Sequence, residues 1–199
     1  MSKKEQTKGQ YIKRQLIETG VIAAVIAVLY FTGLHTEVIG TLQRGLLATG
    51  LIQPAAHVDE DIVSTAAYNL QLYSLEGERT TLAEFEGKTV FMNFWATWCP
   101  PCIAEMPNIN ALHADFAEND SVVFVMLSLD DDPEKARVFM ERKGFDLPVY
   151  FPASRLPGVY NSSTIPTTYV ISPKGQVVLE KQGMANYNTD RFKDFLLGL

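Results

Sequence analysis

The chain has 199 residues, of which 47% are hydrophobic, and a formal net charge of -6. This length suits one domain of ordinary size plus an appendage, and the hydrophobic share is enough for a buried core. Because the acidic excess falls outside the first 34 residues, the main domain is a poor candidate for nucleic-acid binding, which needs clustered Lys and Arg.

The first 34 residues predict a membrane anchor. Residues 16–34 are mostly apolar and as a helix would span about 28 Å, close to the hydrocarbon thickness of a bilayer. No small-residue cleavage site follows, so an uncleaved anchor is favoured over a signal peptide or a buried core helix. By the positive-inside rule, residues 1–15 form a cytoplasmic tail and the rest lies on the extracytoplasmic side of a bacterial membrane. The basic residues of the tail are Lys3, Lys4, Lys8, Lys13 and Arg14.

Residues 35–60 predict a juxtamembrane linker, because the stretch is mildly apolar, contains glycines and has no clear period. It could be a helix near the membrane surface or a plain spacer. Residues 61–199 predict a separate domain. Within it, the alternation over 68–73 is typical of a strand, and the unbroken apolar and aromatic run over 90–95 is typical of a buried central strand.

The run over 90–95 leads to Cys99 and Cys102, the only cysteines of the chain. A C-x-x-C pair can form a redox disulfide or half of a metal site. A structural zinc site needs four ligands, but no second C-x-x-C follows and the histidines, His35, His57 and His113, are scattered. A redox pair without a metal is therefore favoured.

The residues after Cys99 predict the start of a helix. Pro100 and Pro101 suit a first helical turn, where the amide would be unpaired anyway, and a helix is expected from Cys102 to about Asn119. The positive end of its dipole would stabilise a thiolate at Cys99. The sequence therefore predicts Cys99 as the attacking nucleophile and Cys102, one turn further in, as the resolving thiol.

The next segment combines a strand with a helix. Residues 122–129 predict a second buried strand. The acidic run over 130–134 resembles a metal site, but an Asp N-cap followed by Pro133 at the first helical position is favoured. This helix should end at Gly144. The remaining elements are a short strand at 149–151, a helical turn at 156–161, a hairpin of 167–171 and 177–181 around 172–175, and a helix at 190–197.

The motif from Phe94 to Cys102, followed by Glu105-Met106-Pro107, resembles the thioredoxin superfamily. More narrowly, it is similar to the membrane-anchored TlpA/ResA-like thiol-disulfide oxidoreductases, over roughly residues 60–199. The resemblance implies an α/β thioredoxin-like fold, with a central mixed sheet, helices on both faces and an inserted helix and strand around 130–152.

The resemblance also implies the activity. Such proteins face the extracytoplasmic side and reduce disulfides of protein substrates, often those of apocytochrome c. Electrons would come from a membrane thiol transporter of the DsbD/CcdA kind. No bound cofactor and no metal are needed.

Two parts of the chain are expected to meet substrate. The segment from Thr164 to Thr167 matches the family's cis-proline loop, which places Pro166 beside the disulfide. The backbone of Ile165 would then pair with the substrate chain and align its disulfide with Cys99. Trp98, next to Cys99, would offer an apolar contact.

Glu105 is expected to handle the proton of Cys102. Many thioredoxins carry a buried Asp on the central strand six residues before the first cysteine, but here that position is Asn93, which cannot take up a proton. Glu105 lies one helical turn after Cys102 and matches the Glu of the ResA-like motif. An apolar setting would raise its pKa towards the working pH. The alternative is a solvated surface residue.

Other functions stay open from the sequence. A peroxiredoxin-like peroxidase shares the fold but uses a lone thiol, and a Sco-type copper carrier needs C-x-x-x-C. A binding module without catalysis is disfavoured because both cysteines are intact. A thiol oxidase or disulfide donor is the hardest to separate from a reductase, because the direction depends on the reduction potential.

Overall fold

The computed structural model describes residues 3–31, 34–58, 63–160 and 163–199. Residues 32–33 of the predicted anchor and the predicted boundary at 60–61 lie outside this part. The chain divides into two compact units, residues 1–38 and 39–199.

The first unit contains one long helix, α1, over Lys3–Phe31. It has no break at residue 16, so the described part of the predicted cytoplasmic tail continues into the predicted anchor as one helix. Across the residues that the structure describes, no helix reaches the combination of length and hydropathy required of a membrane span. The anchor therefore stays a prediction.

The second unit begins within α2, Leu34–Ala48, and α2 packs on the domain from Gly40 onwards. A Cβ atom at Gly40 would lie 3.4 Å from both the Ile103 side chain and the Pro100 carbonyl oxygen. Leu47 is buried, and Asn186 N donates to Ile52 O at 2.9 Å. This part of the predicted 35–60 linker is thus packed against the domain, which a free spacer would not be.

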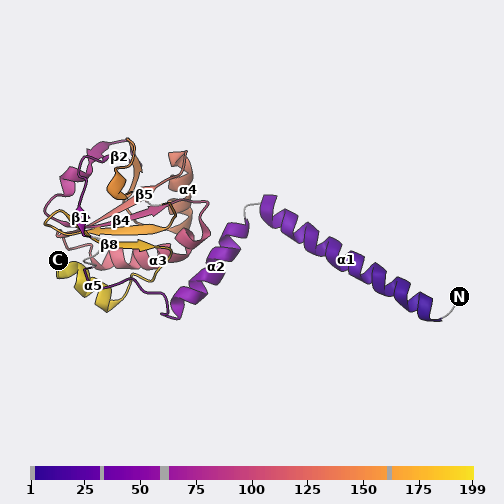
Figure 1. Ribbon diagram of the computed structural model, residues 1–199. Coiled ribbons are helices and arrows are strands. Elements are labelled where there is room, and N and C mark those ends of the chain that lie inside the picture. Colours follow the sequence, from indigo (N-terminus) through magenta and orange to yellow (C-terminus); the bar gives the residue numbers. More distant parts are fainter. Residues whose placement is uncertain (1–2, 32–33, 59–62, 161–162) are drawn as a thin grey trace. The chain divides into compact units, whose positions relative to one another are not determined.

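The second unit is built on one mixed sheet of eight strands in the order β1-β8-β7-β4-β5-β6-β2-β3 (Figure 1). Its centre is β4, which pairs parallel with β5 and antiparallel with β7. All of β4 is buried, which confirms the predicted central strand. The strands are β1 Ser64–Thr65, β2 Gln71–Ser74, β3 Arg79–Thr81, β4 Thr89–Trp95, β5 Val122–Ser128, β6 Val149–Pro152, β7 Thr167–Ile171 and β8 Gln176–Gln182.

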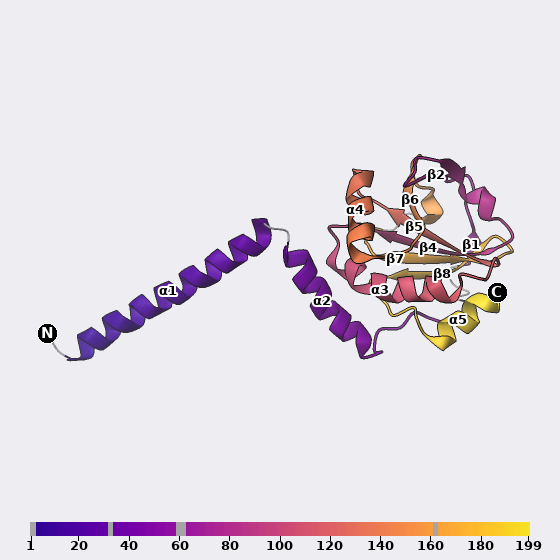
Figure 2. The ribbon, with the colours of Figure 1, turned by 180° about the vertical axis from the view of Figure 1, so that it is seen from behind.

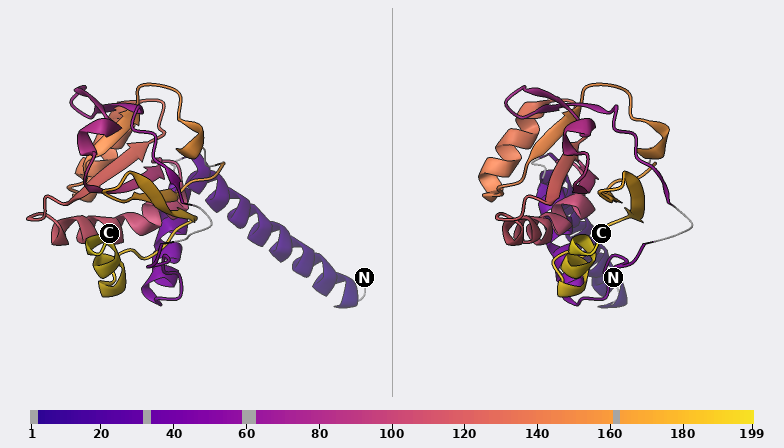
Figure 3. Two further views of the ribbon diagram at one scale, coloured as in Figure 1. Left: turned by 60° about the vertical axis from the view of Figure 1, so that its left-hand side comes forward. Right: turned by 90° about the vertical axis from the view of Figure 1, so that its left-hand side faces the viewer.

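The α-helices α3, α4 and α5 all pack on one face of this sheet. They cover Pro100–Asp115, Pro133–Lys143 and Asp190–Leu197 and share one core cluster with Phe91 and Trp95. Figure 2 shows α3 and α5 along the same side of the strands, and the right panel of Figure 3 shows α3 and α4 together. The parallel strands β4, β5 and β6 follow one another across the sheet in chain order. Because the crossovers between them are right-handed, both connecting helices, α3 and α4, lie on the same face.

The opposite face of the sheet does not match the prediction, which expected helices on both faces. Val90, Met92 and Phe94 point into a second core cluster. Among the described residues, its helical contributions come from two short 3-10 helices, η1 (Leu82–Phe85) and η2 (Gly158–Tyr160), and from no α-helix. The prediction of helices on both faces is therefore wrong for α-helices, because both crossovers fall on the other face.

The acidic run before α4 is a helix start, as predicted. Asp132 is the N-cap, and its side chain accepts a hydrogen bond from Glu134 N at 3.0 Å. Pro133 opens the helix, and Gly144 ends it with a φ of 65°, in the left-handed region that glycine tolerates.

Leu47→Ala tests whether α2 belongs to the folded domain. Because Leu47 is 1% exposed, the substitution should lower the free energy of unfolding by about 2–5 kcal/mol, measured by urea denaturation. Leu42→Ala, on the same helix at 72% exposure, is the matched control and should change it by less than about 0.5 kcal/mol. Equal effects of the two variants would contradict the packing of α2.

Candidate active site

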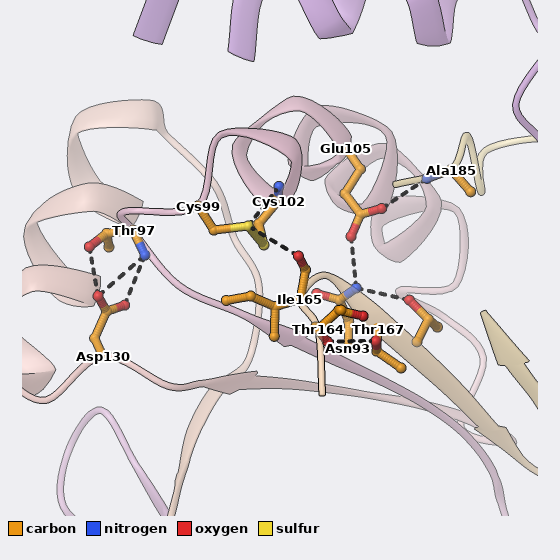
Figure 4. The surroundings of a disulfide bond; sticks show 11 residues. Asn93, Thr97, Cys99, Cys102, Glu105, Asp130, Thr164, Ile165, Thr167 and Ala185 are labelled. Atoms are coloured by element: carbon orange, nitrogen blue, oxygen red, sulfur yellow. Dashed lines mark hydrogen bonds between the residues drawn. A yellow bond between two sulfur atoms is a disulfide. The ribbon is translucent and has the colours of Figure 1, made fainter. Parts of the chain in front are cut away.

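Cys99 and Cys102 form a disulfide at the start of α3, with their Cα atoms 5.3 Å apart. The cysteines lie at the edge of the sheet where β4 ends, because only residues 96–99 separate β4 from α3. The predicted pairing of the two cysteines within one short motif is confirmed. Figure 4 shows the disulfide and its neighbours.

Cys99 is the N-cap residue of α3, as the two prolines predicted. Its sulfur accepts a hydrogen bond from Cys102 N at 3.3 Å. In the reduced protein the same amide and the helix dipole would favour a thiolate at this sulfur. Cys99 is 4% exposed and Cys102 is 0% exposed, so Cys102 is the more shielded of the two, as expected.

The cis-proline loop lies beside the disulfide. The peptide bond between Ile165 and Pro166 is cis, which confirms the expected geometry. The Ile165 carbonyl oxygen lies 3.8 Å from Cys99 Sγ. The loop reaches this place because Thr167, the first residue of β7, pairs with Phe94 near the end of β4.

The two tryptophans of the motif have opposite environments. Trp98 is 58% exposed next to Cys99, whereas Trp95 is fully buried. The Trp95 ring packs against that of Phe139 on α4, with ring centroids 5.6 Å apart. The prediction that Trp95 is a core residue is confirmed.

Glu105 is a buried side chain and not a solvated surface residue. It is 1% exposed on the face of α3 that meets the sheet. Its Oε1 accepts a hydrogen bond from Asn93 Nδ2 at 2.9 Å, and its Oε2 accepts one from Ala185 N at 3.0 Å. Neither of these bonds goes to a cysteine sulfur.

Burial raises the pKa of Glu105 to about 8, although its bonds to Asn93 and Ala185 and the charge of Lys181 act in the opposite direction. The sequence predicted a raised pKa near working pH, and this is confirmed. An isolated charge in an apolar site is disfavoured, so the carboxyl holds its proton more tightly than in water. A pKa of about 8 lies close enough to neutral pH for both the protonated and the ionised form of Glu105 to be populated there.

A second buried carboxylate, Asp130, was missed as part of the site. Its side chain accepts hydrogen bonds from Thr97 N at 3.0 Å, from Thr97 Oγ1 at 2.7 Å and from Ser128 Oγ at 2.9 Å. These bonds tie the loop before Cys99 to the end of β5. The sequence analysis assigned the whole acidic run over 130–134 to the start of α4. The pairing of Trp95 with Ser128 shows that Asp130, the first residue of this run, turns towards the active-site loop.

The family model for AhpC/TSA proteins matches residues 63–179 of the chain, which carry this site. The chain belongs to the AhpC/TSA family. It is 32% identical over 132 residues to the thiol-disulfide oxidoreductase ResA of Halalkalibacterium halodurans, covering 65% of this chain and 74% of that protein. It is 35% identical over 112 residues to the thioredoxin-like protein YneN of Bacillus subtilis, covering 56% of this chain and 66% of that protein.

Solved structures show the same fold. A thiol:disulfide interchange protein of the thioredoxin family from Chlorobium tepidum aligns with a TM-score of 0.55 and 25% identity, covering 66% of this chain and 96% of that one. StoA from Bacillus subtilis aligns with a TM-score of 0.52 and 24% identity, covering 67% and 95%. Together with the paired cysteines, these relatives establish the thioredoxin-like fold and a thiol-disulfide oxidoreductase activity.

The raised pKa of Glu105 predicts a pH dependence of stability. In the oxidised protein, the folded state keeps a proton on Glu105 up to about pH 8, whereas the unfolded chain loses it near the ordinary glutamate pKa of 4.5. The folded state binds more protons in this window, so the free energy of unfolding should fall by a few kcal/mol as the pH rises from about 5 to 8. Urea denaturation at several pH values would measure this fall.

Glu105→Gln should remove most of that slope, because an amide does not titrate. Glu118→Gln is the control, since Glu118 is exposed, and it should keep the slope of the unsubstituted protein. A slope that survives in Glu105→Gln would contradict the assignment.

Proposed function

We propose that this protein reduces disulfides of exported protein substrates through the Cys99–Cys102 pair, on the extracytoplasmic side of a bacterial membrane. The observation that carries the proposal is the position of Cys99. It caps α3 with a backbone amide on its sulfur, and the Ile165 carbonyl group lies alongside.

The first step is the attack of the Cys99 thiolate on a substrate disulfide. One substrate sulfur leaves as a thiolate, and a mixed disulfide joins Cys99 to the other. The Ile165 backbone would pair with the extended substrate chain next to Pro166, and Trp98 would cover an apolar substrate side chain. The exposure of Trp98 and the 3.8 Å approach of the Ile165 carbonyl oxygen to Cys99 Sγ support these roles.

The second step is the resolution of the mixed disulfide by Cys102. Cys102 gives its proton to Glu105 and attacks Cys99 Sγ, so that the second substrate sulfur leaves and the Cys99–Cys102 disulfide forms. The substrate gains two electrons and the enzyme pair loses two. A base is needed because Cys102 is fully shielded from solvent, which opposes thiolate formation.

The resemblance to TlpA/ResA-like proteins supports the proposed partners, and the ResA relatives are named thiol-disulfide oxidoreductases. Apocytochrome c is the proposed substrate class, and a membrane thiol transporter of the DsbD/CcdA kind is the proposed electron donor. The basic N-terminal residues and the apolar stretch over 16–34 support a membrane anchor.

The alternative is the opposite direction, in which the pair acts as an oxidase and donates its disulfide. Both directions use the same residues, so the equilibrium reduction potential decides between them. A potential near that of thioredoxin, about -270 mV, would support reduction, and one near that of DsbA, about -120 mV, would support oxidation.

The roles of the two cysteines can be separated by substitution. Cys99→Ser should abolish the reduction of insulin disulfides, because the attacking sulfur is lost. Cys102→Ser should accumulate a mixed disulfide with substrate, visible on a non-reducing gel. If alkylation of the reduced protein labelled Cys102 faster than Cys99, the assignment would be wrong.

Glu105→Gln should slow the resolution step and spare the first attack. General-base assistance is typically worth about 10²–10⁴-fold in rate, so a loss of at least about a hundredfold is expected in stopped-flow measurements. The pH profile of resolution should also flatten between pH 5 and 9. An unchanged rate and profile would exclude Glu105 as the base.

The proposed topology can be tested on intact spheroplasts. Protease added to spheroplasts should digest the domain over 63–199, because that domain would lie outside the cytoplasmic membrane. A cytoplasmic protein in the same sample serves as the control for membrane integrity. Complete protection of the domain, with the control also intact, would refute the extracytoplasmic location.

A further inference from the structure

Asn93 interrupts the apolar centre of β4, where it is 1% exposed. A buried amide costs free energy unless its polar atoms are paired. Its Nδ2 donates to Glu105 Oε1 at 2.9 Å and to Thr168 Oγ1 at 2.9 Å (Figure 4). Both amide hydrogens are therefore used, and they hold the side chain between α3 and β7.

The donors around Glu105 suit its ionised form. Oε1 accepts a hydrogen bond from the Asn93 side-chain amide, and Oε2 accepts one from the backbone N–H of Ala185. Hydrogen bonds donated to a carboxylate favour the charged form. They oppose burial, which has the larger effect and raises the pKa of Glu105 to about 8.

We propose that Asn93 and Glu105 act as one proton-handling pair, in which the Asn93 amide stabilises the ionised form of Glu105 and orients the carboxylate that receives the proton of Cys102. The inference rests on the proposed base role of Glu105. In this step the S–H bond of Cys102 breaks and an O–H bond forms on Glu105. Asn93 does not touch the reacting sulfur atoms and is a positioning residue.

The protonated carboxyl needs an acceptor, and Asn93 can supply one. Its Oδ1 is buried and has no hydrogen-bond partner among the described residues. A half-turn of the amide exchanges Oδ1 with Nδ2, so that Oδ1 accepts the new O–H of Glu105. An amide offers both a donor and an acceptor, so Asn93 can serve Glu105 before and after the proton transfer.

The other titratable groups near Glu105 cannot replace this contact. Lys181 on β8 acts on Glu105 through its charge alone. Burial and the charge of Glu105 raise the pKa of Tyr187 well above its usual value, so Tyr187 stays neutral. Cys102 is the proton donor itself. The direct side-chain bond to the carboxylate comes from Asn93.

The direct test is the titration of Glu105 in the oxidised protein, in which the cysteines carry no proton. Carbon-13 NMR of protein labelled at the glutamate carboxyl carbon would follow it, with Glu105→Gln to identify the signal. Asn93→Ala should move the midpoint up by at least about one pH unit, which is a tenfold fall in the ionised fraction at pH 7, because a donor to the charged form is lost.

Asn110→Ala is the matched control. The Asn110 amide oxygen accepts a hydrogen bond from Asp146 N, away from Glu105, so the midpoint should stay in place. Asn93→Ser is the second variant if Asn93→Ala does not fold. An unchanged Glu105 midpoint in a folded Asn93 variant would overturn the inference.

Kinetics separate this inference from the proposed function. If the NMR midpoint moves but mixed-disulfide resolution at pH 7 keeps its rate, the base role of Glu105 fails while its pairing with Asn93 stands. If the midpoint rises and resolution slows together, the base role of Glu105 and its pairing with Asn93 are both supported.

A double variant tests the pair as a unit. Asn93→Asp with Glu105→Gln exchanges the carboxylate and the amide between β4 and α3. Because the new Gln amide can donate to the new Asp carboxylate, resolution should be at least about tenfold faster than in Glu105→Gln alone. A folded double variant as slow as Glu105→Gln would overturn the claim that the two side chains act together.

Discussion

The pairing of β4 on both of its edges is the constraint on which the active site depends. Its parallel register with β5 runs from Thr89 to Trp95, and its antiparallel register with β7 places Phe94 beside Thr167. The first register fixes where the chain must leave the sheet to begin α3, and hence where Cys99 lies. The second brings Ile165 to the same edge from a point more than sixty residues away. Two unrelated sequence segments thus form one site because they flank one buried strand.

The site holds two buried carboxylates with different tasks. Asp130 lies at the end of β5 and receives hydrogen bonds from the backbone and side chain of Thr97 and from Ser128, which fix the loop that carries Trp98 and Cys99. Glu105 lies on α3, and each of its carboxyl oxygens accepts one hydrogen bond. The burial of Glu105 raises its pKa to about 8, close to neutral pH, as the proposed role of a base requires. The protein gives up some stability as the pH rises from about 5 to 8, because this group is buried.

The layout of the helices follows from the handedness of the connections. Since β4, β5 and β6 lie side by side in order, both crossover helices fall on one face of the sheet. This puts α3 and α4 next to each other and brings Phe139 onto Trp95, directly behind the active-site motif. The other face is left to short 3-10 helices and loops. Residues 39–52 add to the domain by packing Leu47 and Gly40 inward.

The sequence by itself determined the chemistry of this protein. The spacing of Cys99 and Cys102, the prolines between them and the apolar run of β4 were sufficient to predict a redox pair at a helix start, because these signals are local. The start of α4 at Asp132 and its end at Gly144 were predictable for the same reason.

Only the tertiary structure decided which partners the polar side chains meet. The sequence interpreted Asn93 as a lost proton acceptor and Asp130 as part of a helix start. In the fold, Asn93 donates to Glu105, 12 positions away, because α3 packs on β4, and Asp130 holds Thr97, 33 positions away, because β4 pairs with β5. Burial, which sets the pKa of Glu105, depends on every element packed around α3, and no short stretch of sequence contains that information.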